Sequence, residues 1–383
     1  MTTNLHELFL RLVRLGLGCA DYSSDLIPQL SVKDWQALEN IANEQGLLGV
    51  MLDGVEKLPR ELRPEKKAIL QSIGLLIQSE QQYAVQEHAA TEMALLLHQH
   101  DIRTYVLKGA VVAECYPRPE HRRSVDMDCF LVNENDNVSL NLNDNVNLDF
   151  NAEVWELGNR VVEKAGFEVA RGFYKNSTFH LPGLAVENHR FMTPFRGNKR
   201  LKRLERLLQS MIINDNLNVK VEASNRRLQG TWLYRPPVMV SALFLIEHAY
   251  SHFLHEGLTC RHVLDWTMFS RRHRQEIDWK AFEGYIDEFG FRKFYDSYVR
   301  LGRFLVGELA ADSLQPADRR MLSDVWAPLD LHGSLYGLKA KLQLAGNYWR
   351  ARWKYRLFTD MTWLRALAEW VLGAVFDRQP TLG

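Results

Sequence analysis

The chain has 383 residues, of which 46% are hydrophobic and 25% are charged, a globular composition with enough length for two or three domains. Lysine plus arginine equals aspartate plus glutamate at 47 each, so the net charge draws the chain neither to nucleic acid nor to an anionic membrane. Any binding site for a polyanion must therefore be local.

Signals for secretion, disulfides and membrane insertion are weak in this sequence. The four cysteines are far apart and include no C-x-x-C pair, so neither a disulfide framework nor a zinc knuckle is expected. Glu7, Arg11 and Arg14 interrupt the apolar residues of the N-terminus, which lacks the apolar core of a signal peptide. No window approaches the ~20 apolar residues of a membrane-spanning helix. We expect a cytoplasmic protein without a membrane span.

Residues 1–100 carry apolar residues at helical spacing. One stripe begins at Leu5, and Ser31 followed by Asp34 has the spacing of a capping box at the start of a second helix. The pattern is mostly helical again at 199–383, apart from short breaks. We therefore expect an N-terminal helical lobe and a C-terminal helical region on either side of the centre of the chain.

The centre, residues 101–198, alternates between strand and helix patterns. An asparagine- and aspartate-rich stretch at 133–151 predicts an exposed insertion, whose spacing lacks the glycine and final glutamate of an EF-hand calcium loop. The chain is thus expected to have an α+β fold with a small central core. Its predicted elements are a strand at Thr104–Leu107, a helix at Ala110–Tyr116, a strand at Val125–Val132, a helix at Ala152–Lys164, and strands at Phe167–Tyr174 and Leu184–Phe191 with turns at Asn176 and Pro182–Gly183.

Asp126 and Asp128 are separated by one residue in a predicted strand, so both side chains point to the same face. Two such carboxylates can bridge a pair of magnesium ions and hold a triphosphate, as metal-assisted phosphoryl transfer requires. Gly109 opens a helix after the preceding strand and would let backbone amides approach phosphate oxygens, to which Lys108 adds a positive charge. Alternating aspartates are also often merely solvated, so the pair alone is a weak signal.

A third carboxylate from a neighbouring strand would complete such a metal site. Glu187 is the best-placed candidate, and it would ligate the metal and help to take the proton from the attacking hydroxyl. Glu168 is the alternative third ligand. His189 lies on the same strand face as Glu187. Its alternative roles are to touch the substrate, to orient a ligand carboxylate, or to form hydrogen bonds under the sheet as a structural residue.

Three motifs follow one another in the centre of the chain: Leu107–Lys108–Gly109–Ala110, then Arg122, then Asp126–Met127–Asp128. The order of these motifs resembles that of the family of uncharacterised nucleotidyltransferases within the DNA polymerase β-like superfamily. The resemblance covers most of the chain, and this block is its specific part. Its weaker parts are Glu163–Phe167, Val186–His189, the helical segment with His248 and His252, Arg261–Asp265 and Ile277–Trp279.

The resemblance implies a core built on a small mixed sheet, which binds a nucleoside triphosphate such as ATP with two divalent metals, Mg²⁺ or Mn²⁺. It implies transfer of a nucleotidyl group to a hydroxyl. The chain departs from the superfamily at Ala110, where a serine commonly contacts the phosphates, and in the length of the insertion at 133–151. The residues that the resemblance assigns are Asp126, Asp128 and Glu187 as catalytic metal ligands, and Lys108, Gly109 and Arg122 as nucleotide-binding residues.

Some of these residues have a structural alternative. Arg122 either contacts the phosphates or pairs with a buried acid, since arginine suits both roles. His248 and His252 lie one helical turn apart but have no third ligand in the sequence, which favours lining of the cleft, or packing between lobes, over metal binding.

The stretch Tyr348–Arg356 interleaves cations with aromatic residues, as surfaces that bind single-stranded nucleic acid do. An amphipathic helix whose lysines and arginines extend along apolar surface has the same pattern. A final helix around Trp363 could rest on a membrane surface, but Asp360 and Glu369 favour packing against the protein.

Two function classes follow from the sequence. The first is a metal-dependent nucleotidyltransferase whose acceptor is a small molecule, such as a sugar, or a protein side chain. The second is a noncatalytic module that keeps the fold and binds a partner. Action on an RNA end is a further alternative, although the balanced charge argues against nucleic acid as a partner.

Overall fold

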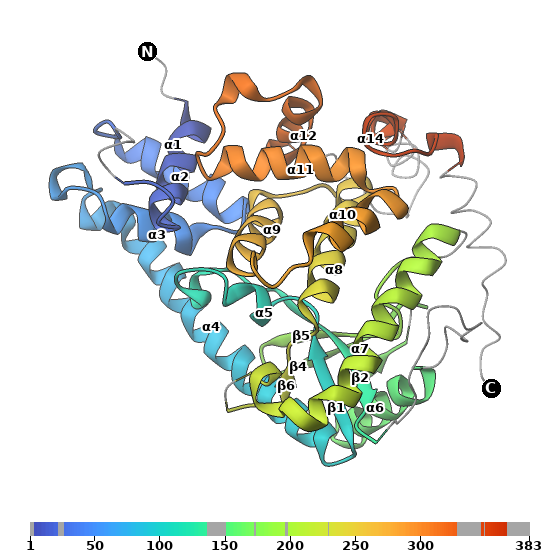
Figure 1. The fold of residues 1–383 in the computed structure, drawn as a ribbon. Coiled ribbons are helices and arrows are strands. Elements are labelled where there is room, and N and C mark those ends of the chain that lie inside the picture. Colours follow the sequence, from blue (N-terminus) through green and yellow to red (C-terminus); the bar gives the residue numbers. More distant parts are fainter. Residues whose placement is uncertain are drawn as a thin grey trace.

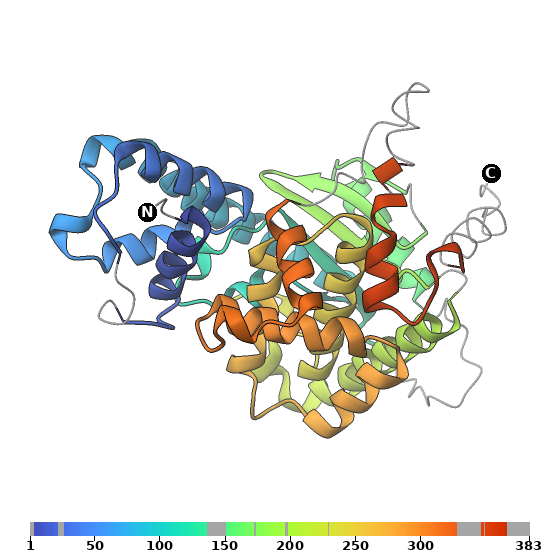
Figure 2. The ribbon, with the colours of Figure 1, turned by 90° about the horizontal axis from the view of Figure 1, so that it is seen from above.

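The computed structural model shows a central sheet with helices on both faces and an N-terminal group of helices that projects to one side (Figure 1, Figure 2). This arrangement confirms the predicted α+β fold. The structure describes residues 4–21, 27–135, 151–171, 174–195, 198–228, 230–327, 346–347 and 349–365.

The N-terminal lobe consists of helices whose apolar faces pack against one another. They are α1 (Leu5–Gly16), α2 (Val32–Glu44), α3 (Leu48–Glu56), the 3₁₀ turn η1 (Arg60–Leu62) and the long α4 (Lys66–His98). Reciprocal hydrogen bonds between Ser31 and Asp34 confirm the predicted capping box. α1 and α3 cross backbone against backbone at Gly16 and Gly54, where an added Cβ would lie 1.9 Å from a carbonyl oxygen of the other helix.

Six strands form one sheet in the order β3-β4-β5-β2-β1-β6. The strands are β1 (Ile102–Val106), β2 (Asp126–Asn133), β3 (Val169–Ala170), β4 (Asn176–Leu181), β5 (Leu184–His189) and β6 (Leu233–Tyr234). Because β2 is antiparallel to β1 and parallel to β5, the sheet is mixed, as the resemblance implies. The connections between the strands contain α5 (Ala110–Ala113), the 3₁₀ turn η2 (Pro119–His121) and α6 (Ala152–Lys164).

One expectation about this region is wrong, and one short strand has no counterpart in the sequence pattern. The sequence pattern places a turn at Asn176, whereas the structure begins β4 there. The other predicted turn, at Pro182–Gly183, is confirmed: the chain reverses into β5 at Gly183, which has a φ of +71°. The region from residue 199 is mostly helical, as expected, but it also contains β6, which pairs in parallel with β1. A strand of two residues is too short to produce a periodic signal.

The C-terminal helices cover one face of the sheet (Figure 1). They are α7 (Lys199–Arg226), α8 (Val238–His255), α9 (Cys260–Arg272), α10 (Trp279–Glu288), α11 (Arg292–Leu305), the 3₁₀ turn η3 (Ala311–Ser313), α12 (Pro316–Trp326) and α14 (Arg352–Phe358). Within the described part of the chain, no helix combines the length and the apolar character needed to cross a bilayer.

Both faces of β2 are covered, which determines where its acidic residues point. Phe130 belongs to the core shared with the C-terminal helices, whereas Cys129 and Leu131 belong to the core shared with α4 and α6. Side chains alternate along a strand, so Asp126 and Asp128 share the face of Phe130. The two carboxylates therefore point toward the layer of C-terminal helices.

A buried histidine ties the N-terminal lobe to the segment that precedes β2. The ring nitrogens of His121, which is 4% exposed, lie 2.9 Å from the Asp53 carboxylate and 2.8 Å from that of Glu80. Burial alone would lower the pKa of His121, but these hydrogen bonds outweigh burial and raise it. The resulting stabilisation is present below the unfolded-state pKa and is lost as the pH rises through the raised folded-state pKa.

We expect the melting temperature of the wild type to fall from about pH 6 to about pH 8.5 by more than that of His121→Gln, because only the wild type loses this stabilisation. Differential scanning fluorimetry at the two pH values measures the effect. His180→Gln, at an exposed position on β4, is the matched control and should follow the wild type. Equal pH dependence in wild type and His121→Gln would contradict the prediction.

Candidate functional site

The parallel pairing of β2 with β5 brings acidic residues from two strands together. Asp128 is paired with Glu187 in the register of these strands, and Asp126 is paired with Ala185. Residues paired in this way point to the same face of adjacent strands. Asp128 and Glu187 thus form one acidic pair on the face that the C-terminal helices cover. Asp126 lies two residues before Asp128 on the same face of β2.

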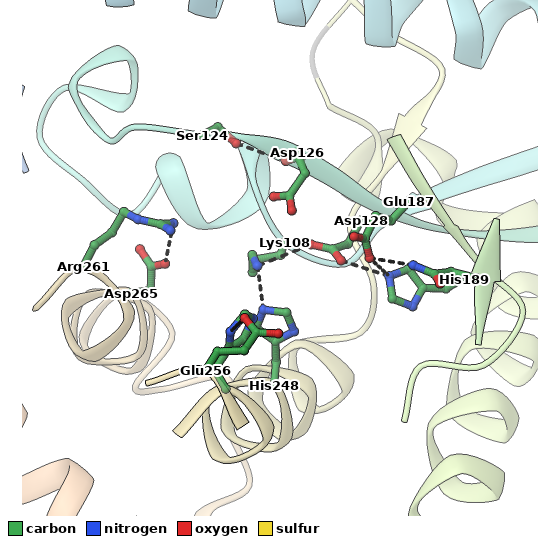
Figure 3. A network of polar contacts seen from close by, with 12 residues as sticks. Lys108, Ser124, Asp126, Asp128, Glu187, His189, His248, Glu256, Arg261 and Asp265 are labelled. Atoms are coloured by element: carbon green, nitrogen blue, oxygen red, sulfur yellow. Dashed lines mark hydrogen bonds and ion pairs between the residues drawn. The ribbon is translucent and has the colours of Figure 1, made fainter. Parts of the chain in front are cut away.

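His189 holds both members of this pair (Figure 3). It is fully buried, and its Nε2 lies 2.9 Å from Oδ1 of Asp128 and 3.5 Å from Oε2 of Glu187. The Nδ2 of Asn176 donates to Oε2 of Glu187 at 2.7 Å. Ligand atoms of Asp128, Glu187 and His189 all lie within 4.8 Å of one another, a cluster that could hold a metal ion. Asp126 does not belong to this cluster.

Lys108 approaches Asp128 from the loop after β1. Its Nζ lies 3.5 Å from Oδ2 of Asp128 and donates to Nε2 of His248 at 2.6 Å (Figure 3). Burial, together with the Lys108 charge, holds the pKa of His248 well below its usual value, so the neutral imidazole can accept this hydrogen bond. The ring of His252 follows one turn later on α8, 4.4 Å away between centroids. Both histidines lie on the Lys108 side of the site, outside the metal cluster.

The pKa values of the three carboxylates depend on burial and on the charged groups beside them. Burial alone would raise the pKa of Asp128, but Lys108 and the hydrogen bond from His189 hold it well below its usual value. The hydrogen bond from His189 also lowers the pKa of Glu187. Burial and the neighbouring Asp128 raise the pKa of Asp126. Asp128 and Glu187 are therefore ionised near neutral pH, and Asp126 is the carboxylate of the three that takes up a proton most readily.

The donor set fits a hard divalent cation such as Mg²⁺ or Mn²⁺. Oδ2 of Asp128 is buried and has no hydrogen-bond partner among the described residues, although Lys108 lies nearby. A buried carboxylate oxygen without a partner is costly unless a positive charge approaches it. Carboxylate oxygens from Asp128 and Glu187 are the ligands these cations prefer, whereas Nε2 of His189 donates to Asp128 and so positions the carboxylates.

Gly109 shapes the turn between β1 and α5. Its φ of +74° lies in the left-handed region, and an added Cβ would lie 3.4 Å from the carbonyl oxygen of Asp126. The turn thus passes close to β2 because it carries no side chain. The helix that follows is shorter than the sequence predicts, since α5 ends at Ala113 rather than at Tyr116.

Comparison with known proteins agrees with this geometry. Residues 31–307 match the model of a family described as uncharacterised nucleotidyltransferase. The chain belongs to this family. No curated protein and no solved structure matches the chain at a significant level. The matched segment runs from the N-terminal lobe through the sheet to the end of α11, so it contains every residue of the candidate site.

In this nucleotidyltransferase, Arg122 is held by a buried acid. Its side chain is 1% exposed, and its Nε and Nη2 donate to the Asp265 carboxylate at 3.0 and 2.6 Å. The hydroxyl of Tyr116 donates to the same carboxylate at 2.9 Å. Burial alone would raise the pKa of Asp265, but the Arg122 guanidinium outweighs burial and lowers it. This is the ion pair given above as the structural alternative for Arg122, and contact between Arg122 and phosphate stays a prediction.

Arg261 is a functional candidate to which sequence reasoning assigns no role. It lies on α9, 3.7 Å from Oδ2 of Asp265, and its side chain is 15% exposed. Its charge also acts on Asp126. Figure 3 shows Arg261 and Asp265 on one side of Asp126, with Glu187 and His189 on the other. The signal that could have found it is the i, i+4 spacing of an arginine and an aspartate on a helix.

The remaining expectations concern Glu168 and the insertion. Glu168 lies beside β3, which β4 and β5 separate from β2, so Glu187 is the better placed third carboxylate of the nucleotidyltransferase. Most of the predicted insertion at 133–151 lies outside the described residues.

Proposed function

We propose that this nucleotidyltransferase moves a nucleotidyl group from a nucleoside triphosphate to a hydroxyl of an acceptor. Membership of the family supports nucleotidyl transfer in general. The observation that carries the proposal is the pairing of Asp128 with Glu187 on parallel strands, where Oδ2 of Asp128 accepts no hydrogen bond from the described residues and lies 3.5 Å from the Lys108 ammonium. The proposed acceptor is a small molecule with a free hydroxyl, such as a sugar, or a hydroxyl side chain of a protein.

In this proposal Asp126, Asp128 and Glu187 hold Mg²⁺ or Mn²⁺, which would neutralise charge on the triphosphate and activate the attacking hydroxyl. His189 keeps two of these carboxylates in place through hydrogen bonds, as partners of metal ligands commonly do. Glu187 has 36% of its side chain exposed, against 2% for Asp128, so it is the better placed of the two to accept the proton of an incoming hydroxyl.

Cations on the helical side of the site would bind the triphosphate. Lys108 lies next to Asp128, and Arg261 lies across from Asp126, so phosphates between them would contact positive charge on two sides. Arginine offers paired donors that match phosphate oxygens, and lysine offers a compact charge. Gly109 keeps the turn free of a side chain, and Arg122, although paired with Asp265, is close enough to interact with the charge of Asp126.

The test is a thermal-shift titration with the four common nucleoside triphosphates, with and without Mg²⁺ or Mn²⁺. A ligand that binds only the folded state stabilises it by about 2.7 kcal/mol at a concentration 100 times its Kd. We expect a metal-dependent rise in melting temperature for the wild type and none for Asp126→Asn. Asp126 is preferred to Asp128 because its pKa is already raised, so loss of its charge disturbs the fold less.

Glu168→Gln is the matched control, since it makes the same acid-to-amide change in the sheet away from β2. It should respond to nucleotide as the wild type does. A shift that persists in Asp126→Asn, or no shift with any nucleotide in the wild type, would instead support a noncatalytic module that binds a partner.

A further inference from the structure

A large pocket lies among the C-terminal helices, apart from the candidate site. Its volume is about 1130 Å³, and α14 contributes much of its lining. Figure 1 shows α14 beside α11, at the opposite end of the molecule from β1 and β2. No carboxylate of the candidate metal site is among the described residues that line this pocket.

Lys354 fixes which face of α14 is turned toward the protein. It is fully buried, its Nζ donates to the carbonyl oxygen of Phe253 on α8 at 2.7 Å, and it lies 2.7 Å from Asp324. Arg352 and Arg356 are on the exposed side of the helix and line the pocket. Anchoring of an amphipathic helix therefore accounts for Lys354 but not for the two arginines.

The pocket has an excess of positive charge. Among the described residues, no carboxylate forms an ion pair with four arginines of its lining, which are Arg320, Arg350, Arg352 and Arg356. Other arginines of the chain, such as Arg292, contact several carboxylates. The two acids that line the pocket, Asp324 and Asp360, are already engaged by Lys354 and Lys293. Among the described residues, the pocket thus carries a local excess of positive charge, in a chain whose formal net charge is zero.

Tryptophans alternate with these arginines. The Arg352 guanidinium lies 3.4 Å from the ring centroid of Trp349, which is 55% exposed. Arg320 lies 4.9 Å from the ring centroid of Trp353. Exposed aromatic rings offer faces on which bases can stack in any sequence, and neighbouring arginines can contact the phosphates between them.

We propose that this pocket binds single-stranded nucleic acid. A base would stack on the exposed Trp349, and phosphates would contact Arg350 and Arg356. A single strand fits better than a duplex because stacking needs unpaired base faces. The proposal does not depend on nucleotidyl transfer, since the two sites share no residue.

The test is fluorescence anisotropy with a labelled single-stranded oligonucleotide of about 12 nucleotides, without metal or triphosphate. We expect the double variant Arg350→Gln, Arg356→Gln to bind at least ~10-fold more weakly. Its slope of log affinity against log salt should be shallower by about 1.4, because each lost phosphate contact removes about 0.7. Trp349→Ala should weaken binding on the order of 10-fold without changing this slope.

The matched control is the double variant Arg60→Gln, Lys164→Gln, which removes the same charge at exposed positions on η1 and α6 and should bind as the wild type does. Asp126→Asn should also bind normally, which separates this site from the proposed nucleotide site. Because the substituted pocket residues are exposed, the melting temperatures should stay unchanged. Absence of binding by the wild type, equal loss in the control, or equal competition by polyglutamate would overturn the proposal.

Discussion

Substitution of Glu187 by glutamine is expected to weaken Mn²⁺ binding by at least about 100-fold, since even loss of a hydrogen-bonding partner of a metal ligand costs roughly 10- to 100-fold. The change removes one of the two ionised carboxylates of the Asp128–Glu187–His189 cluster. It should leave the melting temperature nearly unchanged, because the side chain is partly exposed and the amide keeps an oxygen that can accept from Asn176. Isothermal titration with Mn²⁺ measures the affinity.

Glu168→Gln is the control for this experiment too, because it removes the same charge from the other third-ligand candidate of the sequence. We expect it to bind Mn²⁺ as the wild type does. Equal affinity of Glu187→Gln and the wild type, or a loss in Glu168→Gln alone, would mean that the third carboxylate has been assigned wrongly.

Replacement of Asp265 by asparagine is expected to lower the free energy of unfolding by about 3–5 kcal/mol, because it leaves a buried cation without its counter-ion. Arg122 donates two hydrogen bonds to Asp265 and is 1% exposed, so water cannot take over the lost contacts. Urea denaturation followed by circular dichroism measures the loss, provided that the slope of the transition stays unchanged.

The double variant Arg122→Met, Asp265→Leu is expected to recover a large part of this stability, since apolar side chains of similar volume often replace a buried ion pair without loss. A double variant that is destabilised by the sum of the two single changes would show that the two side chains act independently. That outcome would contradict the buried pair as the source of the effect.

The local chemistry of the site was predictable from the sequence, and its long-range geometry was not. Asp126 and Asp128 stand out because both the motif and the strand that carries it are local. Glu187 could be nominated from its strand pattern, but the register that sets it opposite Asp128 depends on pairing between distant strands. The strand β6 has only two residues and so gives no periodic signal. A turn was predicted at Asn176 because asparagine favours turns, whereas the pairing of β4 with β5 places it in a strand.

The charge partners of the site lie far apart in the chain. Arg122 contacts Asp265 across 143 residues, and Lys108 contacts His248 across 140 residues. Such pairs form only when α8 and α9 pack over the sheet, so no spacing rule could predict them. The same packing determines whether an arginine is buried against an acid, as Arg122 is, or partly exposed across from Asp126, as Arg261 is.

The most direct test of the proposed site is anomalous diffraction from crystals grown with Mn²⁺ and a non-hydrolysable nucleoside triphosphate analogue. We expect a manganese peak at coordination distance from Asp128 and Glu187, with the triphosphate between Lys108 and Arg261. A well-ordered triphosphate bound elsewhere, or manganese bound only at other carboxylates, would contradict it.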